Sequence, residues 1–466
     1  MSSFQQIIKL SLPLIGAQLA QSSLMFTDAI LMGMLGISEL AGGGLGVAVF
    51  HFIFIVATGI LAATINLVAF AKGQDNQDEI HQTLLAGIFL AVILTLITGT
   101  IIWNIAPLLS ILGQSAENTQ LATIYLQAVV WSLLPSFALT VLRNFSLGMS
   151  NAGSILKISL IGAVLNLPVS YVLMNGLLEP WTGIPALGLA GIGYGTSIVL
   201  CCMFTAFAID LYRKPEYKRF YFWHGWNRFD INQLTCTLKL GIPISVAYAM
   251  ESGLFAAAAI FAGWLGSLEL ATHQIALQTI VLAFMLPTGI SQATSVFVGN
   301  HFAKNDIEQV KRYAKSGLIL GAMFTATSAA IMVLFPEFII NLFISADHAE
   351  HKPLVVEMGI KLLVVAAIFQ LVDGTQVIAM GILRGLKMST APTLITAVGY
   401  WLIGFPSAYV LMETYGLVGV WSGLGIGLAA TAAMLMVLFR NKLQKEQRTV
   451  ETVPCSIMQN QINQEA

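Results

Sequence analysis

The feature that most constrains this chain is a series of twelve long apolar stretches separated by short polar ones. A helix needs about 20 mainly apolar residues to cross the hydrocarbon core of a bilayer, and each stretch reaches that length. Only 10% of the residues are charged, against roughly 25% in soluble domains, and the mean hydropathy is +0.81. We therefore predict an all-α integral membrane protein. The expected spans are 11–34, 46–70, 83–106, 120–142, 154–176, 187–210, 240–264, 274–298, 316–336, 356–380, 391–412 and 416–439.

Lysine and arginine gather on one side of the predicted membrane. With the N-terminus on the cytoplasmic side, 20 of the 22 basic residues fall in cytoplasmic loops and tails, and only Lys352 and Lys361 do not. The opposite loops carry acidic residues such as Glu39, Glu117 and Glu269. Cytoplasmic loops are enriched in Lys and Arg, so the pattern predicts twelve helices with both termini in the cytoplasm. The first apolar stretch runs straight into membrane-spanning sequence, and we interpret it as the first helix of a multi-pass protein of the cell inner (plasma) membrane.

The chain is an internal duplication. Residues 9–68 align without a gap onto residues 239–298, and about twenty of the sixty positions are identical. Later echoes pair Tyr171-Val172-Leu173-Met174 with Tyr409-Val410-Leu411-Met412, and Gly188-Leu189 with Gly416-Leu417. Each half therefore holds six helices in the same orientation, a common plan for alternating access with substrate bound near the midplane. We predict an N-terminal six-helix lobe at 1–210, a cytoplasmic linker at 211–238, a C-terminal six-helix lobe at 239–440 and a polar cytoplasmic tail at 441–466.

Three acidic residues, Asp28, Glu251 and Asp373, lie deep within apolar stretches. A charge at the bilayer centre costs about 2.5–3.5 kcal/mol on insertion scales, and no Lys or Arg lies at comparable depth. Because burial disfavours the ionised form, we expect these carboxyls to be protonated or neutralised by a bound cation. Those properties suit a site that exchanges H⁺ or Na⁺ for a cationic substrate. The competing interpretation for each acid is structural, a neutral carboxyl held by hydrogen bonds between helices.

The repeat argues for specialised acids. Asp28 aligns with Ala258, and Glu251 aligns with Gln21, so the acids are not a shared relic of the duplicated unit. Each half has its own arrangement of charge.

Uncharged polar residues mark a candidate substrate cavity. Gln274 and Gln278 are four residues apart, so they share a helix face. Asn166 precedes Pro168, and a proline in a helix frees a backbone carbonyl that could help to hold a cation. Hydrogen bonding between helices is the competing interpretation for all three polar residues.

Other function classes find little support in the sequence. No Walker motif or lysine-bearing glycine loop supports coupling to ATP, and glycine runs in membrane helices more often permit close packing. No His-Glu-x-x-His motif supports an intramembrane enzyme, and the four cysteines show no ligand-like pairing. We therefore expect a transporter rather than an enzyme, with no cofactor beyond a coupling Na⁺ or H⁺. We expect it to act as a monomer in the lipid bilayer, with small-molecule partners and no nucleic acid.

These motifs combine into a family resemblance that covers about residues 5–440. The first helix contains Thr27-Asp28-Ala29-Ile30-Leu31-Met32-Gly33, the seventh repeats that frame with Glu251, and the tenth reads Gln370-Leu371-Val372-Asp373-Gly374-Thr375. The chain resembles the multidrug and toxic compound extrusion (MATE) family, most closely its bacterial NorM branch. The resemblance implies export of cationic, often aromatic compounds in exchange for Na⁺ or H⁺, through two six-helix bundles around a V-shaped cavity.

The resemblance also assigns site residues. The second-lobe cation site of the NorM branch falls on Glu251 and Asp373, which makes these carboxyls the candidate Na⁺ ligands. The family's first-helix aspartate falls on Asp28, and its fifth-helix asparagine falls on Asn166. The DinF-like branch has a second acid one turn after that asparagine, but Ser170 stands there in this chain. Coupling through Glu251 and Asp373 is therefore favoured.

A flippase for lipid-linked saccharides, from the wider superfamily, is the alternative function. Such a protein handles an anionic headgroup and would need basic residues within its cavity. Lys and Arg are absent from mid-span positions, which argues against it.

Overall fold

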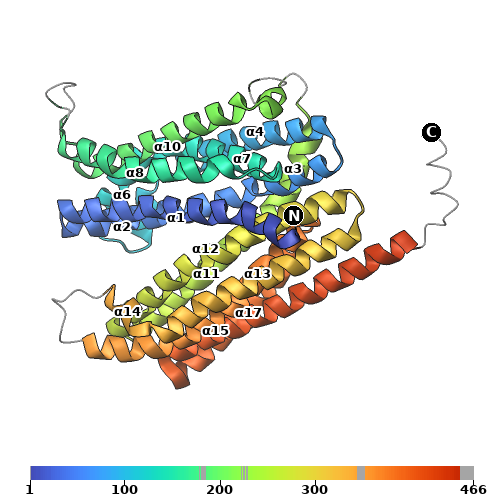
Figure 1. The fold of residues 1–466 in the computed structure, drawn as a ribbon. Helices are drawn as coiled ribbons and strands as arrows, with labels where there is room; N and C mark the ends of the chain where they lie inside the picture. The colour runs from blue at the N-terminus through green and yellow to red at the C-terminus, as the bar shows by residue number, and fades with distance from the viewer. Residues whose placement is uncertain are drawn as a thin grey trace, which may run out of the picture. The chain divides into compact units, whose positions relative to one another are not determined.

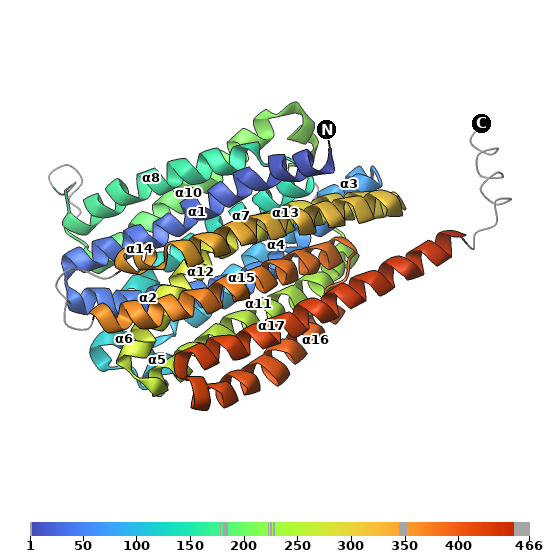
Figure 2. The same cartoon turned by 60° about the horizontal axis from the view of Figure 1, so that its bottom comes forward.

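A computed structural model describes residues 2–177, 179, 185–221, 223, 226, 229–343 and 352–451 of the 466. Every regular element within these ranges is a helix (Figures 1 and 2), which confirms the predicted all-α fold class. Residues 452–466 of the predicted tail, and part of the predicted linker at 211–238, lie outside the described ranges.

Twelve membrane-spanning helices can be traced, as the sequence predicted. Ten helical segments of the described chain are long and apolar enough to cross a bilayer. Helix α1 (Ser3–Leu35) is less apolar, but with 33 residues it is long enough to be an eleventh span. The segment Thr390–Gln447 contains two spans, because Gly416 breaks it with φ 56° and ψ −135°. Each predicted span overlaps one of these helices. Most helices run several residues beyond the predicted ends, since polar end turns continue as helix outside the hydrocarbon core.

The first of two compact units comprises Gln5–Ala256. Two of its membrane spans are interrupted, one at Ala62 and the other by a 3₁₀ turn, and α8 lies beside α10 in both views. After α1, its helices are α2 (Ile37–Leu61), α3 (Ala63–Gly73), α4 (Gln77–Trp103), α5 (Ala106–Ile111), α6 (Ala116–Val129), η1 (Val130–Ser132), α7 (Leu133–Gly148), α8 (Gly153–Asn175), α10 (Gly188–Arg213), η2 (Pro215–Phe220) and the first part of α11 (Ile231–Leu265).

The second unit comprises Ser2–Phe4 and Ala257–Ala466. It contains a π-helical turn, η5, that lies directly before Pro406, whose missing N–H interrupts the α-helical ladder. The last part of α17 extends beyond the ends of α13 and α15 (Figures 1 and 2). The helices of this unit are the rest of α11, α12 (Ser267–Ala303), α13 (Ile307–Leu334), α14 (Pro336–Asn341), α15 (Lys352–Gly385), α16 (Thr390–Ala397), η5 (Val398–Gly404) and α17 (Phe405–Glu451).

The duplication is visible in the backbone as well as in the sequence. Three pairs of equivalent positions share a positive φ: Gly36 (157°) with Gly266 (152°), Asp75 (53°) with Asn305 (57°), and Gly188 (53°) with Gly416 (56°). Glycine occupies two of the pairs because it takes these values without steric cost. Equivalent turns in the two halves therefore use the same backbone geometry.

The compact units divide inside α11, at Ala256, rather than at the predicted linker. The first part of α11 packs on α2 and α3: Leu240 and Ile244 join a buried cluster with Ala63 and Leu67, and the Ser245 hydroxyl donates to a backbone carbonyl of α2 at 2.6 Å. Packing thus divides the chain at Ala256, whereas the sequence repeat divides it at the linker. The lobes at 1–210 and 239–440, as units that move against each other, stay a prediction.

The described part of the segment between α10 and α11 is tied to the first unit by aromatic side chains. Tyr217 of η2 is buried, lies edge-on to Phe145 of α7, and accepts a hydrogen bond from Asn151 at 3.1 Å. Burial raises the pKa of the Tyr217 hydroxyl to about 12, so this group stays neutral at physiological pH. Arg213, Lys218 and Arg219 are exposed around it.

Candidate functional site

Small residues let α10 approach two neighbouring helices closely. A methyl group at Gly195 would lie 2.6 Å from the Ser170 Cα of α8, and one at Gly193 would lie 3.0 Å from the Tyr125 carbonyl oxygen of α6. Close helix packing of this kind needs residues without a side chain. The two contacts hold α10 against α8 and α6 and place Thr196 between them.

The Asp28 carboxyl, on α1, accepts hydrogen bonds from three side chains. Tyr125 Oη donates to Oδ2 at 3.0 Å, and Asn166 Nδ2 donates to Oδ1 at 3.0 Å. Thr196 Oγ1 lies 3.0 Å from Oδ1, 2.9 Å from Oδ2 and 3.3 Å from Asn166 Oδ1. The structure therefore brings together two predicted site residues, Asp28 and Asn166, in a polar group that we call the Asp28 cluster (Asp28, Tyr125, Asn166 and Thr196).

The Asp28 cluster is enclosed, and none of its members is a cation. Asp28 is 2% exposed and Asn166 is fully buried. The three donors are neutral, so they stabilise the carboxylate through hydrogen bonds without cancelling its charge. Carboxylate, amide and hydroxyl oxygens are also the ligands that hard cations prefer. The cluster therefore has the acid and the oxygen ligands that binding of a proton or a small cation requires.

Two members of the cluster, Tyr125 and Thr196, were not predicted. Their spans read as apolar, and a single Tyr or Thr in such a span is ordinary. The available signal was the glycine pattern of α10, since Thr196 directly follows Gly195. Ser170, where the DinF-like branch has an acid, is buried, and its hydroxyl has no hydrogen-bond partner among the described residues.

Asp373 lies in a row of buried polar residues on α15. Gln370, Asp373 and Gln376 are at most 3% exposed, and their spacing of three places them on one helix face. Gln376 Nε2 donates to the Tyr400 hydroxyl of η5, whereas the Gln370 amide has no hydrogen bond in the part of the chain that the structure describes. Asp373 therefore belongs to a polar strip inside the second unit.

Close packing holds this strip in place. A methyl group at Gly385 would lie 2.7 Å from the Ser295 carbonyl oxygen of α12, and one at Gly381 would lie 2.8 Å from the Ser291 carbonyl oxygen. The Ser291 hydroxyl donates to the Val377 carbonyl oxygen at 2.7 Å. As in the first unit, glycines set the position of the helix that carries the acid.

The remaining predicted site residues are more accessible. Glu251 is half-buried, on the part of α11 that belongs to the first unit. Gln274 and Gln278 are exposed on α12 of the second unit. Within the described ranges neither glutamine side chain forms a hydrogen bond. No hydrogen bond among the described residues joins these glutamines to the buried strip around Asp373.

Arg143 lies inside a helix rather than in a loop. It is five residues before the end of α7, and its Nη1 donates to Gln21 Oε1 of α1 at 2.8 Å. Gln21 is the position that aligns with Glu251 in the second half. The same position thus carries an amide bound to a cation in the first half and a carboxyl in the second.

The Asp28 cluster has no counterpart in the second half. Across the repeat, Asp28 aligns with Ala258 at an offset of 230. The later echoes, at offsets of 238 and 228, pair Asn166 with Gly404 and Thr196 with Leu424. The side chains equivalent to Asp28, Asn166 and Thr196 are therefore apolar or absent, and the two halves differ at these positions.

The match to a known family falls on both halves. The MatE family model matches residues 13–172 and 243–410. A relative from Pseudomonas aeruginosa is 37% identical over 438 residues, which cover 94% of this chain and 89% of the relative. A relative from Synechococcus is 33% identical over 440 residues, which cover 94% of each chain. The chain belongs to the MATE family of transporters, on its NorM-like branch.

Solved structures of MATE proteins have the same fold as this family member. A MATE protein crystallised in the bent conformation superposes with a TM-score of 0.86 at 20% identity, covering 97% of this chain and 98% of that one. A eukaryotic MATE transporter gives a TM-score of 0.83 at 17% identity, covering 96% and 99%. The two curated relatives are each named a probable multidrug resistance protein NorM.

Proposed function

We propose that this MATE-family protein exports cationic, often aromatic compounds across the inner membrane in exchange for Na⁺ or H⁺. The names of its relatives support the substrate class, since proteins 37% identical to it are called multidrug resistance proteins. The uneven distribution of Lys and Arg supports cytoplasmic termini. We further propose that a single chain suffices for transport.

The observation that carries the proposal is the Asp28 cluster. Its carboxyl is 2% exposed in a membrane-spanning helix, and the donors to it are neutral. Binding a proton or Na⁺ there changes the charge inside the helix bundle by one unit. An ion can drive export when it binds the outward- and inward-facing states with different affinities. In this proposal the affinity of Asp28 for the ion differs because the hydrogen bonds to its carboxyl differ between the two states.

Glu251 and Asp373 are proposed as the coupling acids of the second half. Asp373 is buried on α15, and Glu251 is half-buried on α11. In this proposal a cationic substrate and the coupling ion compete for the negative charge of these carboxyls. Gln274 and Gln278 then offer exposed amides to the substrate, and Asn166 contributes to the cavity through its bond to Asp28.

The first test replaces the acids one at a time. Glu251→Gln and Asp373→Asn should each abolish efflux of a cationic dye from cells, while the amount of protein in the membrane stays unchanged. Glu357→Gln is the matched control, because Glu357 lies on the same helix as Asp373 but is exposed and paired with Lys361. Near-normal dye export by both acid variants would overturn the proposed coupling role.

The second test identifies the ion. Purified protein in liposomes is given a Na⁺ gradient or a proton gradient separately, and uptake of a cationic dye is measured. One gradient should drive transport and the other should not. If neither gradient drives transport of any cationic dye, the proposed antiport is wrong.

A further inference from the structure

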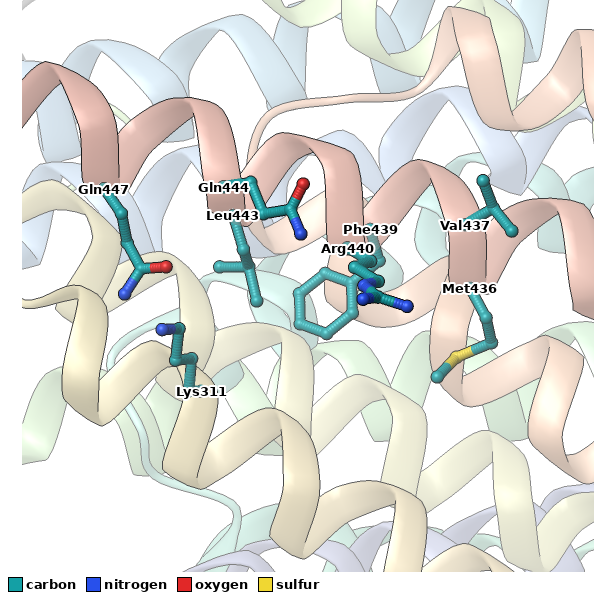
Figure 3. A pocket seen from close by; sticks show the side chains of 8 residues that line it. All are labelled: Lys311, Met436, Val437, Phe439, Arg440, Leu443, Gln444 and Gln447. Carbon is teal, nitrogen blue, oxygen red and sulfur yellow. The ribbon is translucent and has the colours of Figure 1, made fainter.

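A groove of about 520 Å³ lies on the second unit, between α13 and the last turns of α17. Figure 3 shows the side chains that line it. One comes from α13 and the rest come from α17: Lys311, Met436, Val437, Phe439, Arg440, Leu443, Gln444 and Gln447. None of these residues belongs to the predicted ion or substrate site.

The chemistry of the groove changes along its length. Met436 and Val437 lie at one end in Figure 3, and Lys311 and Gln447 lie at the other, with Arg440 between them. The first end offers apolar surface. The other end offers cationic and amide donors. A ligand that fits both ends is amphipathic and carries a negative charge.

The change in chemistry coincides with the edge of the hydrocarbon core. Gly416 marks the opposite end of this span. At 1.5 Å per residue, Met436 lies about 30 Å along the helix and Arg440 lies about 36 Å along it, compared with a core of about 30 Å. Lys311 is likewise about 35 Å from the other end of α13 at Leu334. Both cations therefore fall at the level of the lipid headgroups.

The two cations are available to an external anion. Arg440 is exposed and Lys311 is half-buried, and within the described chain neither forms an ion pair. Glu446, the next acid along α17, is already bound to Lys442 at 2.6 Å. Basic pockets between membrane helices at this level bind anionic lipid headgroups.

We propose that this groove is a binding site for an anionic phospholipid. The lipid phosphate lies against Lys311 and Arg440, and the headgroup hydroxyls bind the amides of Gln444 and Gln447. An acyl chain follows Met436 and Val437 into the hydrocarbon core. Because α13 and α17 each supply a cation, the bound lipid joins the two helices and stabilises the second unit.

The test measures lipid retention and thermal stability together. Wild-type protein and the double variant Lys311→Gln/Arg440→Gln are purified in detergent and titrated with phosphatidylglycerol or phosphatidylcholine. Phosphatidylglycerol should raise the melting temperature of the wild type and be retained in native mass spectra. The double variant should lose both effects, and its melting temperature in phosphatidylcholine should equal that of the wild type, which shows that it folds.

The control variant Lys304→Gln/Arg312→Gln removes the same charge from exposed positions outside the groove. It should keep the response to phosphatidylglycerol. If both double variants lose the response to phosphatidylglycerol equally, general surface charge explains the response and the proposed site is wrong. A variant that lacks residues 452–466 tests whether the chain's own tail occupies the groove. If this variant binds phosphatidylglycerol and the full-length protein does not, the tail fills the groove and the proposal is wrong.

Discussion

At the scale of single residues, the surroundings of Asp28 decide what its carboxyl can do. An isolated charge in a membrane helix is costly, yet three neutral donors converge on this one from α6, α8 and α10. They lower the cost of ionisation while leaving the charge available to a proton or a cation. A basic partner would instead have neutralised the carboxylate permanently. The cation Arg143 does not do this, because it donates to the neutral amide of Gln21.

Thr196 is the donor that lies within hydrogen-bond distance of both oxygens of Asp28. Removing its hydroxyl should therefore affect the Asp28 carboxyl most strongly. A hydrogen bond to a charged group contributes about 1.5–3 kcal/mol. We expect Thr196→Val, which keeps the shape but removes the hydroxyl, to lower the efflux rate about tenfold or more at normal expression. Initial rates of dye efflux from cells measure this.

Thr205→Val is the matched control for that experiment. Thr205 lies on the same helix but is exposed, and its hydroxyl donates to the carbonyl oxygen of Cys201, within its own helix, at 2.9 Å. It should transport like the wild type. A Thr196→Val protein with an unchanged rate would show that the cluster is structural.

At the scale of helices, glycines determine which surfaces can meet. The run Gly42-Gly43-Gly44 shows how position decides the role of each residue. A methyl group at Gly43 would lie 2.6 Å from the sulfur of Met32, whereas one at Gly44 would meet nothing within 4 Å. Adjacent glycines on one helix thus face a packed neighbour in one case and open space in the other.

We expect Gly195→Ala to destabilise the protein. Its new methyl group would lie 2.6 Å from the Ser170 Cα, and overpacking of this kind costs about 1–3 kcal/mol. Gly44→Ala should leave the melting temperature unchanged or raise it, because alanine is the better helix former by about 1 kcal/mol. Melting curves of the detergent-purified variants compare the two. Equal stability would mean that α10 can move away from α8 at little cost.

At the scale of the whole molecule, the duplication supplies two similar scaffolds and the divergence supplies two different sites. Equivalent turns keep the same backbone geometry, as at Gly188 and Gly416. The side chains inside do not match: the first unit holds the Asp28 cluster, while the second holds a polar strip around Asp373. The two halves therefore share the helix frame and differ in their buried polar residues.

The orientation in the membrane makes a further prediction. Single cysteines are introduced at Glu117 and Lys304, both exposed, in a variant that lacks the natural cysteines. A membrane-impermeant maleimide should label position 117 on intact cells, because the proposed topology places that loop outside the cell. Position 304 should react only after permeabilisation. The reverse pattern would place the termini outside and overturn the proposed topology.

The number of spans, the repeat and the three acids within apolar stretches were available from the sequence alone. Apolar length, the sides on which Lys and Arg fall, and identity at a fixed offset are one-dimensional properties, and the physics of the bilayer converts them directly into topology. An acid such as Asp373 is conspicuous in an apolar stretch wherever its helix packs. The same reasoning predicted helices that are shorter than the observed ones, because hydropathy does not indicate how far a helix continues beyond the hydrocarbon core.

The partners of those acids came only from the tertiary structure. Thr196 and Tyr125 are unremarkable in sequence, and they reach Asp28 because Gly195 and Gly193 set how closely α10 approaches two neighbours. Likewise, the lipid groove pairs Lys311 with Arg440 across more than a hundred residues. Which side chains meet depends on the rotation and crossing of each helix, and these are fixed by packing among all the helices of a unit, not by any one segment.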